Sequence, residues 1–308
     1  MCKDKKNVAE IITERLIKKI NSEGKLPWMK PFISFRRNYI LGYVYKGINS
    51  LILSKSCYYI TYKQLKDYNK KHKTDYYIYK PEEYEVVVFY KKNLRELNED
   101  EKGKYLKGEK VLNLEEIDGV PYIKHIVLRY TKVYPIEYII DSKGNNLPDV
   151  NIKEEKKNLS AEDIISNYMA FSNVKLYTDS PKAYYSPSED VVHVPPVKNF
   201  KNVEFSYRVR FHEIGHSTGV KSRLNRSCFD NYHKTKPERS REELVAELTS
   251  LLLATEAGFT NEECFETKNS DSYILSWLEY LNNNPKEIIY AMSLAEKARD
   301  YILGKNNE

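Results

Sequence analysis

The sequence predicts an α+β protein of two domains, from three observations. Its 308 residues, 41% hydrophobic and 31% charged, are enough for two compact domains. Apolar stripes at helical spacing and short alternating β patterns occur in both halves. A polar stretch over residues 141–159, with Gly, Pro and a charge run, separates the halves as a linker. We therefore expect domains at residues 1–140 and 160–308.

The first half carries the patterns of an α+β domain. Residues 7–22 form an amphipathic helix that ends at Gly24, and we expect its apolar stripe to dock on the sheet that follows. A short helix capped by Thr61 comes later. Residues 91–118 lack an apolar stripe, which indicates an inserted hairpin or mobile excursion. The expected strands are residues 39–45, 48–53 and 58–60, and a pair formed by 85–90 and 123–133.

The second half begins with a helix from Ser160 to about Met169, capped by Ser160 and Asp163. A strand at residues 174–177 and a hairpin over 183–196 follow, and helices over 272–278 and 285–303 close the domain. We expect the strand before Pro195 to be an edge strand to which an extended peptide could add. His193 lies in that strand and is expected to be a surface or core histidine rather than a metal ligand.

The two halves differ in charge. Residues 1–150 hold 29 basic and 20 acidic side chains, a balance of +9, whereas residues 151–308 hold 21 and 24, a balance of −3, which gives the net +6. Residues 1–80 alone hold 18 basic against 6 acidic side chains. A surplus of this size in a small domain is typical of a protein that binds a polyanion.

Compartment and membrane association follow from composition. The four cysteines are far apart in sequence and form no C-x-x-C pair, so we expect free thiols. No run of about 18 apolar residues occurs, and the N-terminus is charged, so we expect neither a membrane span nor a secretory signal. The expected location is cytoplasmic.

The stretch from Phe211 to Gly219 contains the pattern H-E-x-x-H. His212 and His216, four residues apart, share one face of a helix and can direct both imidazoles at one metal ion. Glu213 is then placed to accept a proton from water at that ion, as a general base. The preceding apolar residues support a buried helix, and Gly219 is expected to end it in the left-handed conformation.

The next strong helix offers the third ligand, because Glu243 and Glu247 share one of its faces. A carboxylate in a core helix is costly unless it is paired or binds a metal. We expect Glu243 to be the ligand and Glu247 to hydrogen-bond a ligand histidine. Two alternatives remain open: Glu247 is itself the ligand, or Glu243 forms a capping box with Ser240.

Basic and aromatic residues alternate in the first half. Single-stranded nucleic acid is bound by cations along its backbone and by flat rings on which bases stack. No recognition-helix pattern favours duplex DNA. The clusters from which we expect such contacts are Trp28 with Lys25 and Lys30, Arg36 and Arg37 beside Tyr39, Tyr45 beside Lys46, and Tyr62 beside Lys63.

Several strings, in order along both halves, resemble ArdC-type antirestriction proteins. In the first half they are Leu26-Pro27-Trp28-Met29-Lys30-Pro31, Val44 to Leu53 and Tyr59 to Gln64; in the second, Ala183 to Pro187, Pro195-Pro196, His212 to His216, Ser222 to Arg226 and Glu242 to Glu247. The family commonly has a glycine-rich turn before its V-V-F strand, where this chain has Lys80-Pro81-Glu82-Glu83-Tyr84.

The resemblance implies an N-terminal α+β single-stranded-DNA-binding domain, with Asn49 in its surface, and a C-terminal zincin-like metallopeptidase domain. Such proteins of conjugative plasmids, integrative elements or phages help incoming DNA escape restriction, and one could be delivered with transferred DNA. The similarity of Glu243-Leu244-Val245-Ala246-Glu247 to E-x-x-A-acid also implies that the first acid binds the metal.

We thus expect a protein that binds single-stranded DNA and uses zinc, or another divalent transition metal such as manganese, at His212, His216 and Glu243. A protein or peptide would be the substrate, and Tyr232 and His233 are candidates to stabilise the oxyanion. Two alternatives are a non-catalytic DNA-coating protein with a structural zinc, and a cytosolic metallopeptidase with an unrelated basic domain. Mutation of Glu213 distinguishes the expected peptidase from the DNA-coating protein. Measurement of the affinity for single-stranded DNA distinguishes it from the metallopeptidase with an unrelated basic domain.

Overall fold

The first half is built around a long β-ribbon. The computed structural model describes residues 7–26, 36–149, 159–200, 202–259 and 271–305. The elements of this half are α1 (Val8–Glu23), β1 (Arg37–Asn38), α2 (Ile48–Ile52), β2 (Tyr58–Ile60), α3 (Tyr62–His72), β3 (Tyr77–Ile78), β4 (Glu85–Glu96), α4 (Glu99–Leu106), β5 (Leu114–Ile117), β6 (Val120–Pro135), a 3-10 turn (Ile136–Tyr138) and β7 (Ile139–Ile140).

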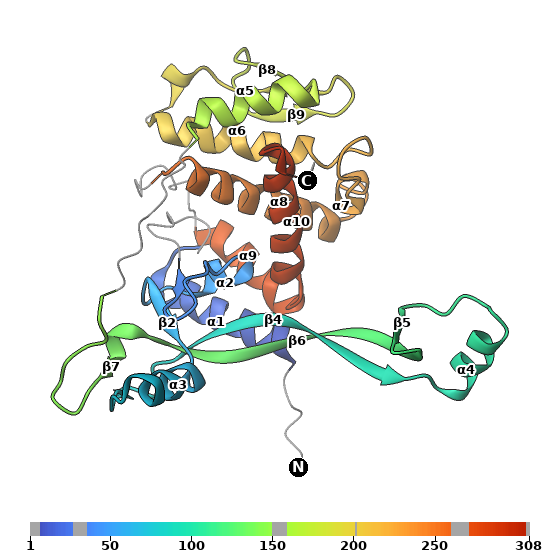
Figure 1. Cartoon of the computed structure of the whole chain (residues 1–308). Coiled ribbons are helices and arrows are strands. Elements are labelled where there is room, and N and C mark those ends of the chain that lie inside the picture. The colour runs from blue at the N-terminus through green and yellow to red at the C-terminus, as the bar shows by residue number, and fades with distance from the viewer. Residues whose placement is uncertain (1–6, 27–35, 150–158, 201, 260–270, 306–308) are drawn as a thin grey trace.

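The ribbon confirms the predicted pairing of 85–90 with 123–133 and extends it. β4 and β6 are antiparallel from Glu85 opposite Val133 to Glu96 opposite Tyr122, and the sheet order is β1-β2-β6-β4, with β5 also on β6. In Figure 1 the ribbon crosses below α8, α9 and α10 and ends at one side in an arm formed by α4 and β5. The expected insertion at 91–118 is thus a continuation of the ribbon that ends in a short helix.

The predicted strand at residues 48–53 is wrong, because this segment forms the helix α2. Ile48 and Leu51, three residues apart, point into the main core. The Asn49 side-chain amide accepts a hydrogen bond from the Val88 N–H at 2.7 Å and donates to the Val88 carbonyl at 2.8 Å. These contacts fix a helical turn against β4, which a short apolar run alone does not specify.

The second half is mainly helical. Its elements are α5 (Ala161–Ser172), β8 (Lys175–Tyr177), β9 (Tyr184–Ser186), β10 (Val191–His193), a 3-10 turn (Val197–Asn199), α6 (Val203–Ser217), α7 (Ser227–Asp230), α8 (Lys236–Glu256), α9 (Asp271–Asn283) and α10 (Glu287–Ile302). The predicted cap of α5 is confirmed, since Ser160 and Asp163 form a capping box. α6 and α8 pack against each other (Figure 1).

The expected edge strand before Pro195 is not at an edge. The small sheet has the order β8-β10-β9, so β10 lies in the centre and β9 forms one edge. β10 pairs in parallel with β8 and antiparallel with β9. The parallel partner, β8, precedes the hairpin in the sequence, and the hairpin pattern alone does not predict this pairing.

One hydrophobic core joins the two halves. The α1 stripe confirms the predicted amphipathic helix, since Ile12, Leu16 and Ile20 are buried and Gly24 ends the helix in the left-handed conformation. This stripe contacts α2 and β6 but also α9, and the Thr13 hydroxyl donates to the Pro285 carbonyl at 2.6 Å. The helix thus docks on the second half as well as on the sheet. None of the described helices is long and apolar enough to cross a membrane.

Candidate metal centre

Helix α6 carries the H-E-x-x-H pattern on a buried face. The Asn202 side chain accepts the Glu204 and Phe205 N–H groups and so caps its start. The helix ends at Ser217, and Gly219 does not adopt the predicted left-handed conformation. A Cβ there would instead lie 2.7 Å from the Phe229 ring. Glycine is needed at this position for close packing rather than for its backbone angles.

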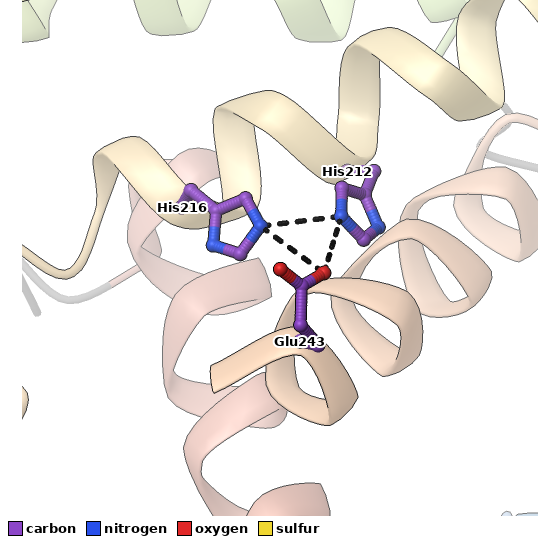
Figure 2. A group of neighbouring side chains, drawn as sticks. All are labelled: His212, His216 and Glu243. Atoms are coloured by element: carbon purple, nitrogen blue, oxygen red, sulfur yellow. Dashed lines mark hydrogen bonds and ion pairs between the residues drawn. The ribbon is translucent and has the colours of Figure 1, made fainter. Parts of the chain in front are cut away.

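His212, His216 and Glu243 meet at one point. The two histidines project from consecutive turns of α6 toward Glu243 on α8 (Figure 2). Their Nε2 atoms are 3.2 Å apart, and Glu243 Oε2 lies 3.4 Å from His212 Nε2 and 3.8 Å from His216 Nε2. Among the described residues, this is the one cluster of three His, Cys, Asp or Glu side chains whose ligand atoms all lie within 4.8 Å of one another.

Burial raises the pKa of the Glu243 carboxyl, but its contacts with the two imidazoles outweigh burial and lower it. Glu243 is the eighth residue of α8, whose N-cap is Thr235. The alternative of a capping box with Ser240 is therefore wrong, because the helix begins one turn earlier than that pattern suggested. The carboxylate is ionised and is not used by a cap.

Glu247 lies behind His212 rather than within the cluster. Its Oε1 is 3.8 Å from His212 Nδ1, the ring nitrogen opposite the one that faces Glu243. The buried Arg208 guanidinium lies 3.6 Å from Glu247 and donates to Ser250 at 3.2 Å. This geometry matches the supporting role expected for Glu247 and favours Glu243 over Glu247 as the ligand.

Glu242 is a site residue that sequence reasoning missed. Its side chain is fully buried, and it accepts a hydrogen bond from His216 Nδ1 at 3.2 Å. Arg226 donates to both of its oxygens, from Nε at 2.9 Å and Nη2 at 2.5 Å, and the Cys228 thiol donates at 3.1 Å. Each histidine is therefore backed by a carboxylate, and each carboxylate by an arginine. The available signal was a second acidic residue, directly before Glu243, in a core helix.

The centre opens into a cleft of 460 Å³. Glu213, which follows His212 in the sequence, lines this cleft together with the two histidines. Another wall of the cleft is formed by β9 and its flanking residues Ala183 and Pro187. The Tyr232 hydroxyl donates a hydrogen bond to Glu243 Oε1, and burial together with that bond raises the pKa of Tyr232 to about 12. His233 also lines the cleft. The two oxyanion candidates are thus both beside the centre.

The donor set fits a divalent transition metal. Two imidazole nitrogens and one carboxylate oxygen converge, and this is the three-ligand set that leaves a position open for water or substrate in catalytic sites. Glu242 accepts a hydrogen bond from His216 Nδ1, and Glu247 lies 3.8 Å from His212 Nδ1, so that both Nε2 atoms face the cluster where a metal would bind. His193 is not part of this cluster: its Nδ1 lies 2.9 Å from Asp179, and its ring stacks on Tyr184.

Eight of the residues predicted to contact nucleic acid fall into three groups. Arg36, Arg37, Tyr45 and Lys46 line one cavity. Tyr62 and Lys63 are exposed at the start of α3. Trp28 and Lys30 lie outside the described residues.

Asn49 and Tyr45, both predicted to contact nucleic acid, have structural roles that the sequence did not reveal. The Asn49 amide is occupied by the Val88 backbone. Tyr45 is buried, and its hydroxyl accepts a hydrogen bond from Asn38 at 3.1 Å. A buried ring contributes a wall rather than the open stacking platform expected of Tyr45, because a base can stack only on an accessible face.

Comparison with known families defines the class. Residues 162–294 match the family described as zincin-like metallopeptidase, so the second half is a zincin-like domain, a class that implies a divalent metal. Residues 6–125 match the family described as the N-terminal domain of anti-restriction factor ArdC. With both domains in this order, the chain belongs to the ArdC-type antirestriction proteins, as the sequence motifs predicted.

Similarity to solved structures and to other proteins extends over nearly the whole of this chain. The crystal structure of metal-free antirestriction protein ArdC from plasmid R388 superposes with a TM-score of 0.67, at 25% sequence identity, and the match covers 97% of this chain and 98% of that one. The Mn(II)-bound structure of the same protein superposes with a TM-score of 0.64, at 23% identity, and the match covers 98% of this chain and 100% of that one. Two Escherichia coli proteins named DNA primase TraC are 28% and 27% identical over 98% and 97% of this chain. The chain spans 28% and 20% of their lengths. An uncharacterized protein of Sinorhizobium fredii, y4eC, is 23% identical, covering 98% of this chain and 93% of its own length.

Proposed function

We propose that this protein binds single-stranded DNA of a mobile element and acts as a metal-dependent peptidase on proteins near that DNA, so that the element escapes restriction. The observation that carries the proposal is the convergence of His212, His216 and Glu243 in a cleft that also contains Glu213. Zinc is the expected metal, and the Mn(II) form of the R388 protein supports manganese as an alternative. The antirestriction name of that relative supports the biological role.

The chain's own residues account for the parts of a hydrolytic reaction. A bound divalent metal would supply Lewis acidity for water and for the substrate carbonyl. Glu213 accepts the proton from the attacking water and donates it to the leaving amine. Tyr232, whose hydroxyl contacts Glu243, can redirect that hydroxyl to the developing oxyanion. The β9 edge provides backbone groups along which an extended peptide can bind.

The basic first half supports the DNA-binding part of the proposal. Its +12 balance over residues 1–80 indicates contacts with a phosphate backbone, and such binding weakens steeply as salt rises. Arg36 and Arg37, which the sequence placed in one cluster, and Lys46, which it placed in another, lie around one cavity. Binding of a labelled oligothymidylate, measured against salt, tests this part directly.

The variant Glu213→Gln tests the catalytic part. The substitution keeps the size of the side chain and removes the base, so metal and DNA binding should persist while peptidase activity and protection from restriction in a transfer assay are lost. Unchanged protection would contradict the peptidase role and would favour protection by DNA coating alone.

A further inference from the structure

A second cavity lies where the two halves meet. It has a volume of 330 Å³ and is lined by Arg36, Arg37 and Lys46 of the first half. Its opposite wall is formed by the C-terminal end of α8, by Arg299 in the last turn of α10 and by Lys305, three residues beyond that helix. Helices α2 and α10 are in contact beside it (Figure 1). The cavity is therefore built from both halves of the chain.

The wall of this cavity is strongly cationic. Its described lining residues include the five basic side chains just named and two acidic ones, Glu256 and Asp300. Asp300 accepts hydrogen bonds from Arg299 at 2.7–2.8 Å, and Glu256 lies 3.7 Å from Lys305. The lining residues thus carry a surplus of three positive charges, which favours an anion.

The remaining wall is apolar and offers space for more than an inorganic ion. Val44, Tyr45 and Leu252 line the cavity together with the small side chains of Ser50 and Thr255. A volume of 330 Å³ is at the lower end of the range of small-ligand sites, roughly 300–1,000 Å³. Cations beside an apolar wall match the chemistry of one nucleotide unit, in which an anionic phosphate is joined through the sugar to a base with a flat apolar face.

Packing between the halves holds the two walls in place. Ile48 and Leu51 of α2 belong to the same buried core as Ala295 and Ile302 of α10. Gly47, with φ of +60°, brings the backbone against Glu296 of α10, and a Cβ at this position would lie 2.9 Å from the carboxylate oxygen. Even if Glu296 is counted with the cavity, a surplus of two positive charges remains.

We propose that this cavity binds one nucleotide unit of single-stranded DNA, with Lys305 and Arg299 of the zincin-like half completing a phosphate site begun by Arg37 and Lys46. The inference rests on the proposed DNA-binding function and extends the DNA surface onto the second half. Thr255, near the end of helix α8, lines this cavity, and Glu243 lies twelve residues earlier in the same helix. At 1.5 Å per residue, DNA bound here lies about 18 Å along the helix from the metal ligand.

The test compares Lys305→Glu with Lys297→Glu in the full-length protein. Both substitutions reverse one charge near the end of the chain, but Lys297 is an exposed residue of α10 that does not line the cavity. Fluorescence anisotropy with a labelled oligothymidylate should show about tenfold weaker binding for Lys305→Glu and a salt dependence reduced by about one phosphate contact. Lys297→Glu should bind within about twofold of wild type.

A neutral variant separates the local site from long-range charge. Thr255→Phe places a ring in the cavity without changing any charge, and it should weaken oligonucleotide binding several-fold while circular dichroism reports an unchanged fold. Competition by inorganic phosphate at millimolar concentration should be weak, and competition by a second oligothymidylate should be strong. Full displacement by inorganic phosphate would overturn the nucleotide assignment in favour of a free-phosphate site.

The outcomes distinguish the two levels of the proposal. If wild type does not bind the oligonucleotide at all, both the DNA-binding function and this site are wrong. If wild type binds and Lys305→Glu and Lys297→Glu weaken it equally, the DNA-binding function stands and this cavity is not the site.

Discussion

The substitution Arg226→Met tests the support behind His216. The Arg226 guanidinium is 2% exposed and the Glu242 carboxylate is fully buried. Arg226 donates two hydrogen bonds to Glu242, one to the Thr218 hydroxyl at 2.6 Å and one to the Gly215 carbonyl at 3.0 Å. Methionine fills most of the volume but leaves the carboxylate without its cation. Removal of one partner from a buried pair costs about 3–5 kcal/mol.

Urea unfolding at neutral pH measures this loss, and Arg223→Met is the matched control. The Arg223 side chain is 5% exposed, but its partner Asp190 is 42% exposed, so solvent compensates that carboxylate and the expected loss is only about 1–2 kcal/mol. Metal affinity, measured by competition with a chromophoric chelator, should fall about 10–100-fold for Arg226→Met because His216 loses its orientation. Equal stability losses in the two variants, with unchanged metal affinity in Arg226→Met, would refute the reasoning.

Two further predictions concern the fold around the centre. Burial opposes ionisation of Asp190, but hydrogen bonds from Arg223 and Tyr185 lower its pKa, so this carboxylate stabilises the fold above its unfolded pKa, and the contribution is lost as pH falls through the lower folded pKa. Thermal melts should therefore show that Asp190→Asn lowers the Tm more at pH 7 than at pH 3; an equal effect at both values would contradict this origin. Gly219→Ala should lower the unfolding free energy by about 1–3 kcal/mol, because its Cβ meets the Phe229 ring. Phe229→Ala, which removes the ring together with its Cγ, should relieve part of that loss in the double variant, and strict additivity would exclude the Phe229 ring as the source of the clash.

The sequence predicted the residues whose positions depend on one helix. The spacing of His212 and His216 fixes their common face on any α-helix, and the same periodicity related Glu243 to Glu247. The capping boxes of α3 and α5 were equally local, because each depends on residues three positions apart. Such features follow from short-range geometry, which the sequence specifies directly.

The features that escaped prediction depend on distant partners. Glu242 supports His216 because Arg226, sixteen residues earlier in a loop, turns back to meet it. The strand order that places β9 at the edge depends on β8, and helix α2 depends on the Val88 backbone. The cavity between the halves required the packing of α2 on α10, and no local pattern specifies that contact.

Metal content of purified variants tests the central claim most directly. Wild type should hold about one equivalent of zinc or manganese per chain, and His216→Ala and Glu243→Ala should each lose it, because three protein ligands are needed for stable binding. Glu247→Ala should retain metal with reduced affinity, since this residue lies behind His212. Full metal content in Glu243→Ala, together with its loss in Glu247→Ala, would contradict the ligand set and assign the third position to Glu247.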